Sequence, residues 1–192
     1  MVAHSSDLVC IQEVGMRDGL QSAGQFVTTK DTVRLIDQLS KTGLSKIEVT
    51  SFVSPQAVPL LADAEEVLAS INRQPSVTYS ALIPNLRGLD RALAVELDEV
   101  KVVMSVSEAH NLANLRMTCE QSIEQFRGIC NNRGSLRVNG TLATAFGCPF
   151  HGEVKQSTVF DWAHRYLDAG IDSLTLADTL GAATPRQVYD LC

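Results

Sequence analysis

The chain has 192 residues, of which 45% are apolar and 20% are charged, an ordinary composition for a globular domain with a real core. Its net charge of -6 argues against nucleic acid as a partner, because nucleic-acid-binding domains present a basic face. No unbroken run of about 18 apolar residues occurs, so the sequence predicts neither a membrane span nor a membrane partner. Residues 1–7 are polar and lack the basic and apolar regions of a targeting segment.

The cysteines indicate a reducing compartment. There are five, an odd number, and no two are spaced as a CxxC pair. We therefore expect reduced thiols and a cytoplasmic location. Cys10 is expected to be a small core residue of the first strand, and Cys148, which follows a glycine at a strand end, a buried structural thiol.

Strand and helix patterns alternate along the whole chain. The predicted strands are 8–14, 46–51, 77–82, 99–105, 136–145 and 173–177. The predicted helices are 29–43, 58–71, 85–93, 107–133 with a break near 117–118, 157–169, and one that begins at 184. The last start is clear, because Thr184 can cap the helix, Pro185 suits its first turn and Gln187 completes a capping box.

Six repeated strand–helix units imply a parallel sheet, for which two architectures compete. A doubly wound open sheet should carry a glycine-rich phosphate motif after its first strand, and Gly15 and Gly19 do not form one. In a (β/α)8 barrel, polar residues collect at the ends of the strands on one face. Such residues follow or end five of the strands here: Arg17, Asp18, Gln21, Glu48, Thr50, Ser51, Asn85, Ser105, Ser107, Asp178 and Thr179. This pattern favours the barrel.

The most informative segment follows the first strand. Arg17 and Asp18 lie between Gly15 and Gly19, directly after an apolar run. Neighbouring residues of a regular strand point to opposite faces, so both can serve one site only if the chain has already left the strand. The two glycines make such a bend feasible. Taken alone, the pair also fits a simple surface ion pair.

The chain has fewer units than a closed barrel requires. Eight units and about 250 residues are typical, so the first and sixth strands would have open edges. We expect residues 1–192 to form a single barrel domain whose C-terminal units are missing, as in a fragment of a longer chain. Open edges also favour association, and we expect a homo-oligomer.

Six segments, in order, resemble the 3-hydroxy-3-methylglutaryl-CoA lyase family of the DRE-TIM metallolyase superfamily. They span nearly the whole chain: residues 15–21 (GMRDGLQ), 47–55 (IEVTSFVSP), 84–88 (PNLRG), 105–108 (SVSE), 146–150 (FGCPF) and 178–181 (DTLG). Each is weak by itself, whereas the ordered set is specific. The second segment distinguishes lyases from the related Claisen synthases.

The resemblance implies a (β/α)8 TIM barrel, an acyl-CoA substrate, a divalent metal (Mg or Mn), and carbon–carbon lyase activity that yields acetyl-CoA and acetoacetate. By the same resemblance, Asp18 is a metal ligand, and Arg17 binds substrate and stabilises the enolate. Glu48 and Asp178 are acidic residues near the reacting groups. The resemblance also places Gln21 beside the substrate, and we expect two further substrate contacts at strand ends, Asn85 and Ser107.

The residue types suit that chemistry. Breaking the carbon–carbon bond generates an enolate, and a cation beside its oxygen lowers the barrier. Arg17 stays charged at any working pH, and Asp18 offers the oxygen ligands that Mg²⁺ prefers. A general base must also remove the hydroxyl proton of the substrate.

Two departures from the family matter. The remaining metal ligands, a His-x-His pair and an asparagine, and a catalytic cysteine would lie beyond Cys192, and the four histidines of this chain lack metal spacing. One aspartate holds a divalent metal poorly, so we expect these 192 residues to be inactive alone. On the fifth strand the family commonly reads Arg-Gly-Tyr, whereas this chain has Asn139, Gly140 and Thr141. The neutral Asn139 thus stands where the family commonly has an arginine, so the sequence does not identify the acyl group of the substrate.

Two other functions remain possible. A Claisen-type synthase of the same superfamily should carry Thr-Leu-Arg-Asp-Gly where this chain has Gly15, Met16, Arg17 and Asp18. A non-catalytic, truncated subunit would persist only through association with a partner, because of its open sheet edges.

Overall fold

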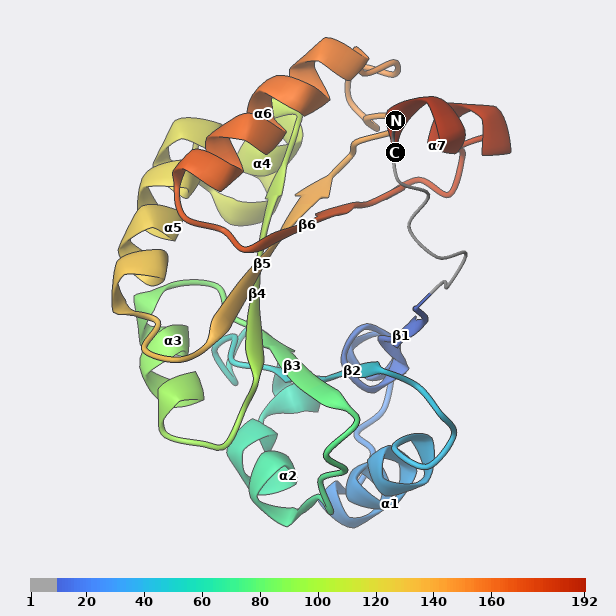
Figure 1. Cartoon of the computed structure of the whole chain (residues 1–192), viewed down its shortest axis with the longest axis vertical. Helices are drawn as coiled ribbons and strands as arrows, with labels where there is room; N and C mark the ends of the chain where they lie inside the picture. The colour runs from blue at the N-terminus through green and yellow to red at the C-terminus, as the bar shows by residue number, and fades with distance from the viewer. Residues whose placement is uncertain (1–9) are drawn as a thin grey trace, which may run out of the picture.

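The computed structural model describes residues 10–192, which alternate between strands and helices (Figure 1). The strands are β1 (Gln12–Glu13), β2 (Lys46–Ser51), β3 (Thr78–Leu82), β4 (Glu99–Ser105), β5 (Arg137–Ala143) and β6 (Ser173–Leu176). The helices are α1 (Thr29–Leu39), α2 (Ala64–Ser70), α3 (Leu86–Leu93), α4 (Glu108–Leu115), α5 (Cys119–Asn132), α6 (Gln156–Asp168) and α7 (Pro185–Leu191). None of the helices in this part of the chain is long and apolar enough to cross a membrane.

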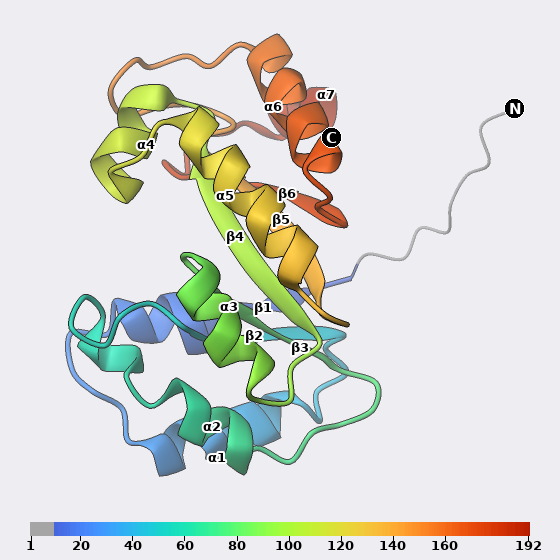
Figure 2. The same ribbon diagram turned by 90° about the vertical axis from the view of Figure 1, so that its left-hand side faces the viewer.

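The strand order settles the architecture. All neighbouring strands are parallel, and the sheet order β1-β2-β3-β4-β5-β6 follows the chain order. A doubly wound sheet reverses its order at a switch point, so it would not run in sequence from edge to edge. The sheet instead curls, with helices on its convex side (Figures 1 and 2). The expected incomplete (β/α)8 barrel is confirmed.

The two faces of the sheet differ in polarity. Alternate strand residues, among them Ile47, Val100 and Val102, are fully buried in the hydrophobic core that the convex face forms with the helices. The residues between them face the barrel interior and include buried charged groups. Lys46 and Glu99 form an ion pair near the amino ends of the strands. The core thus lies between sheet and helices, and the concave face carries the buried charged groups.

A close contact joins β5 to α6. Tyr166 is fully buried, and its hydroxyl accepts a hydrogen bond from the Met104 N–H (3.1 Å) and donates one to the Thr141 carbonyl (3.0 Å). The ring lies against Gly140, where an added Cβ would be 2.2 Å from the Tyr166 Cδ1 atom. Only glycine leaves room at this position, so residue 140 controls how closely the helix approaches the sheet.

Several local expectations need correction. β1 is shorter than the predicted 8–14, of which residues 8 and 9 lie outside the described part, and Cys10 is exposed and precedes the strand. The predicted helix over 58–71 is divided into a 3-10 turn at Pro59–Leu61 and α2, because Pro59 begins the turn and Asp63 precedes a separate helix. The break near 117–118 is confirmed, since Thr118 caps α5 with a capping box.

Replacing Gly140 with alanine should destabilise the protein by about 2 kcal/mol or more, because the new methyl group would overlap the Tyr166 ring in a packed core. Urea unfolding measures the change. Gly128→Ala is the matched control: it lies within α5 with its nearest neighbour at 3.8 Å, and should stabilise by about 0.5–1 kcal/mol. Equal stabilities of the two variants would contradict the packing described here.

Candidate active site

The site begins where the chain leaves β1. Residues Gly15–Gly19 form one π-helical turn, in which the N–H groups of Arg17 and Asp18 both donate to the Val14 carbonyl (3.1 and 2.7 Å). The Gly15 N–H donates a hydrogen bond to a carboxylate oxygen of Glu13 (2.5 Å), which ties the start of the turn to β1. The turn places both side chains together, with the Arg17 Nη1 atom 2.8 Å from Asp18 Oδ1. The bend expected from the sequence is present.

A buried carboxylate organises the site. The Glu48 side chain is fully buried on β2 and lies between two cations. Its Oε1 atom accepts a hydrogen bond from the Arg17 Nε–H, and its Oε2 atom lies 2.8 Å from the Lys101 Nζ atom. An isolated buried carboxylate would be very costly, and this double pairing compensates its loss of hydration. The three residues tie the turn after β1 to β2 and β4.

A β-bulge adjoins this carboxylate. Glu48 pairs with Ser80 of β3, but the next paired residue of β2 is Thr50, opposite Ala81. Val49 is therefore the extra residue of the bulge. Bulges re-aim side chains and are common beside active sites.

A cavity of about 650 Å³ opens above the buried carboxylate. It lies toward the carboxyl ends of β3, β4 and β5, with alternate residues of β4 and β5 forming its wall. Three of the predicted site residues, Arg17, Gln21 and Asn85, line this cavity, and their roles toward a substrate remain predictions. Its other lining residues are Val53, Val58, Leu82, Ile83, Pro84, Lys101, Val103, Asn114, Leu115, Met117, Gln125, Phe126, Thr141, Ala143 and Ala177.

Four predicted site residues do not line the cavity. Glu48 lies behind Arg17, and Asp18 is 66% exposed on the outer side of the same arginine. Ser107 caps α4 by accepting a hydrogen bond from the His110 N–H (3.3 Å). The Asp178 carboxylate accepts a hydrogen bond from the Ala183 N–H (2.8 Å) in the loop after β6. Their functional roles remain predictions.

Ser107 also contacts a thiol. The Cys148 Sγ atom is buried 3.0 Å from the Ser107 Oγ atom, in agreement with the expected burial of this cysteine. Burial acts to raise the pKa of the thiol, but the hydrogen bonds with Ser107 and with the backbone of Phe150 and His151 outweigh burial and lower that pKa. The described cysteines are all free thiols, as expected.

Lys101 and Asn111 are two residues that the motif analysis missed. Lys101 interrupts an apolar strand, and its position between Val100 and Val102 was the available signal. Asn111 is fully buried: its Oδ1 atom accepts from the Ser105 N–H (2.9 Å), and its Nδ2 group donates to the Met117 carbonyl (3.0 Å). Asn111 thereby fixes the corner between α4 and α5, which forms one wall of the cavity.

The residues present do not make a complete metal site. Within residues 10–192 there is no group of three or more His, Cys, Asp or Glu side chains that could hold a metal ion. Asp18 is the predicted ligand, and its carboxylate already pairs with Arg17. The described residues alone therefore do not fit a tightly bound divalent metal.

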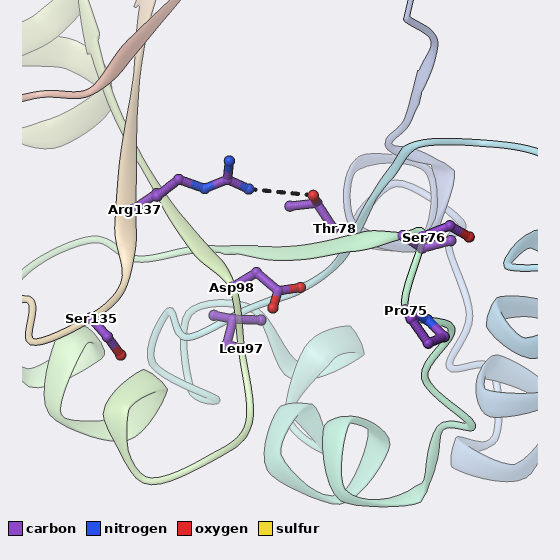
Figure 3. Close-up of a pocket in the computed structure, with 8 residues that line it drawn as sticks. Pro75, Ser76, Thr78, Leu97, Asp98, Ser135 and Arg137 are labelled. Atoms are coloured by element: carbon purple, nitrogen blue, oxygen red, sulfur yellow. Dashed lines mark hydrogen bonds between the residues drawn. The ribbon is translucent and has the colours of Figure 1, made fainter.

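A second hollow lies at the opposite ends of the strands (Figure 3). It has a volume of about 440 Å³, and Arg137 donates a hydrogen bond to Thr78 Oγ1 (3.3 Å) across it. Asp98, also in its wall, is already paired with Arg73 (2.8 Å) and with the Tyr79 N–H (2.7 Å). Barrel enzymes hold their chemistry at the carboxyl ends, so this hollow is not the candidate site.

Replacing Glu48 with alanine should cost about 3–5 kcal/mol, since the variant leaves the buried Lys101 ammonium without its carboxylate. Glu48→Gln keeps a hydrogen-bond acceptor for Arg17 and should cost less. Asp18→Ala, which removes the exposed partner, should change the stability by at most about 1 kcal/mol. Guanidinium chloride unfolding orders the three variants, and a Glu48→Ala protein as stable as Asp18→Ala would contradict the buried ion pairs.

Comparison with known proteins gives a consistent result. The HMGL-like family profile matches residues 9–192. The chain is 43% identical to the hydroxymethylglutaryl-CoA lyase YngG of Bacillus subtilis, over 94% of this chain and 61% of that protein. It is 40% identical to the mitochondrial hydroxymethylglutaryl-CoA lyase of Mus musculus, over 95% of this chain and 57% of that protein. The chain thus spans about three fifths of the length of these curated relatives.

Solved structures agree in fold. The Bacillus subtilis HMG-CoA lyase superposes with a TM-score of 0.92 at 42% identity, covering 95% of this chain and 62% of that one. An HMG-CoA lyase from Acinetobacter baumannii, in complex with coenzyme A and 3-methylmalate, gives a TM-score of 0.92 at 47% identity, covering 100% of this chain and 63% of that one. On this evidence, the chain belongs to the HMGL-like family.

Proposed function

We propose that residues 1–192 form a single barrel-domain portion of an acyl-CoA lyase. The reaction would cleave 3-hydroxy-3-methylglutaryl-CoA, or a close analogue, to acetyl-CoA and acetoacetate. The observation that carries this proposal is the Arg17 guanidinium, held at the cavity wall by the buried Glu48 carboxylate. The lyase relatives and the coenzyme A bound to one of them support an acyl-CoA ligand.

The residues of the candidate site would have different roles in this reaction. In a retro-Claisen cleavage, a base removes the proton from the substrate hydroxyl, the carbon–carbon bond breaks, and its electrons form the enolate of acetyl-CoA. Arg17 would stabilise the enolate oxygen with a fixed positive charge. Both Glu48 oxygens are occupied by cations, so we assign Glu48 the task of orienting Arg17. Gln21 and Asn85 would contact the substrate. No residue is assigned as the base that removes the hydroxyl proton; Asp178 is the acidic residue that the resemblance places near the reacting groups.

The cofactor predicted by resemblance is a divalent metal, Mg or Mn. Since the described residues supply only Asp18 toward it, no step of the reaction is assigned to the metal here. The relatives include both mitochondrial and cytoplasmic lyases, and a cytoplasmic location and a homo-oligomer remain our proposals. Size-exclusion chromatography tests the oligomer.

We expect residues 1–192 to bind Mg²⁺ or Mn²⁺ only weakly, because one exposed carboxylate offers too few oxygen ligands. Isothermal titration calorimetry of the chain with each metal measures this. Asp18→Asn should abolish the residual binding, while Asp31→Asn, at an exposed site in α1, should not change it. Tight binding by the unmodified chain would contradict the expectation.

The activity itself is best tested in a chimera, in which this chain is continued by the remaining carboxyl-terminal part of the Bacillus subtilis lyase. We expect release of acetyl-CoA from 3-hydroxy-3-methylglutaryl-CoA. Arg17→Gln should lower kcat about 100-fold or more, the range for loss of a group that stabilises an oxyanion. Arg34→Gln, an exposed arginine of α1, should have no effect. A folded chimera that instead condenses acetyl-CoA with a 2-oxo acid would show a synthase.

A further inference from the structure

Lys101 is a buried cation with unused hydrogen-bonding capacity. Its side chain is 7% exposed, and its Nζ atom contacts the Glu48 carboxylate at 2.8 Å. An ammonium group has three N–H donors, and Glu48 is its sole ion-pair or hydrogen-bond partner within residues 10–192. The neighbouring Asn139 amide, its partner in the register of β5, is engaged by Ser173 and Thr175 of β6. Two donors of Lys101 are therefore available to a ligand.

Those donors face the candidate cavity. Lys101 lines it together with Arg17, and the adjoining wall residues Leu82, Val103 and Phe126 are apolar. Charge–charge attraction is stronger next to such a wall than in bulk water. An acceptor in the cavity would therefore gain more from Lys101 than from a surface lysine.

Both charged residues that line the cavity are cations. Two cations, Arg17 and Lys101, line it, and the single carboxylate between them, Glu48, lies behind the wall. Asp18 pairs with Arg17 from the solvent side and does not line the cavity either. The remaining polar lining residues, such as Gln21 and Thr141, are neutral. The cavity lining thus carries positive charge only, although the four charged groups together are neutral, and this lining favours an anionic group.

We propose that Lys101 binds the free carboxylate at the acyl end of the substrate and so selects acidic acyl groups, while Arg17 keeps the enolate oxygen as its partner. This inference rests on the proposed function for the identity of the ligand. A carboxylate is small enough to reach Lys101 on β4, and its oxygens can accept hydrogen bonds from the two free N–H groups of that ammonium.

The test uses the 192-residue chain and 3-methylglutarate, a dicarboxylate without coenzyme A, in an NMR chemical-shift titration. Lys101→Met should weaken binding at least about 10-fold, the usual effect of losing a charge-assisted hydrogen bond, whereas Lys101→Arg should retain most of the affinity. The neutral diamide of the same acid should bind weakly to all variants. Inorganic phosphate should bind less tightly than the dicarboxylate.

Lys46→Met is the matched control. Lys46 is also an inward-facing lysine paired with a buried glutamate, Glu99, but it lies at the amino end of the sheet and does not line the cavity. It should leave dicarboxylate binding unchanged. If Lys101→Met does not fold, the double variant Glu48→Gln/Lys101→Met removes both charges of the pair, and it should show the same loss of binding.

Four results would overturn the inference: no dicarboxylate binding by the unmodified chain, Lys101→Met binding within about 2-fold of it, an equal loss in Lys46→Met, or tighter binding of phosphate than of the dicarboxylate. The proposed function fails separately. If the chimera releases no acetyl-CoA while the dicarboxylate still binds through Lys101, the anion site is supported and the lyase assignment is contradicted.

Discussion

The pairing of one buried carboxylate with two cations is the interaction on which the rest of this site depends. Glu48 has no access to water, and each of its oxygens meets a positive charge from a different element. The arginine comes from the turn after β1 and the lysine from β4, so the interaction fixes three parts of the sheet relative to one another. It also holds the guanidinium of Arg17 in one place, which lowers the entropic cost of binding a ligand there.

The arrangement explains why the concave face can carry buried charged groups. Charged groups inside a protein are tolerated when they are paired. The interior of this sheet contains two such ion pairs, Lys46 with Glu99 and Lys101 with Glu48. The apolar stabilisation comes from the other side, where the convex face of the sheet meets the helices. The apolar core therefore lies on the convex side of the strands, whereas the candidate site lies toward their carboxyl ends, where barrel enzymes hold their chemistry.

Much of the fold was predictable from the sequence because its signals are local. Strand–helix alternation, the break near 117–118, the capping box at Thr184 and the polar strand ends each depend on short segments. The extent of β1 was not predictable, because a two-residue edge strand pairs with only one neighbour, and the described residues Cys10 and Ile11 of the apolar run precede it. Likewise, Cys10 looked like a core residue only on the assumption that the strand began earlier.

The candidate site was predictable to the extent that its residues follow strand ends. Arg17, Gln21 and Asn85 do so, and they share a cavity. Lys101 lies within a strand, and its partner Glu48 is 53 positions away in sequence, so their contact depends on strand order and register. Ser107 also follows a strand end, but its hydroxyl is engaged in the cap of α4 and in the contact with Cys148.

The sequential order of the strands has a consequence for how the chain acquires its structure during synthesis on a ribosome. Each new strand adds beside the one translated just before it, and each helix covers the pair already formed. Each of β2 to β6 can dock on the strand made just before it, and the charged groups of the inner surface can stay hydrated until their partners are made. Such a sheet can therefore be assembled progressively, in the direction of translation.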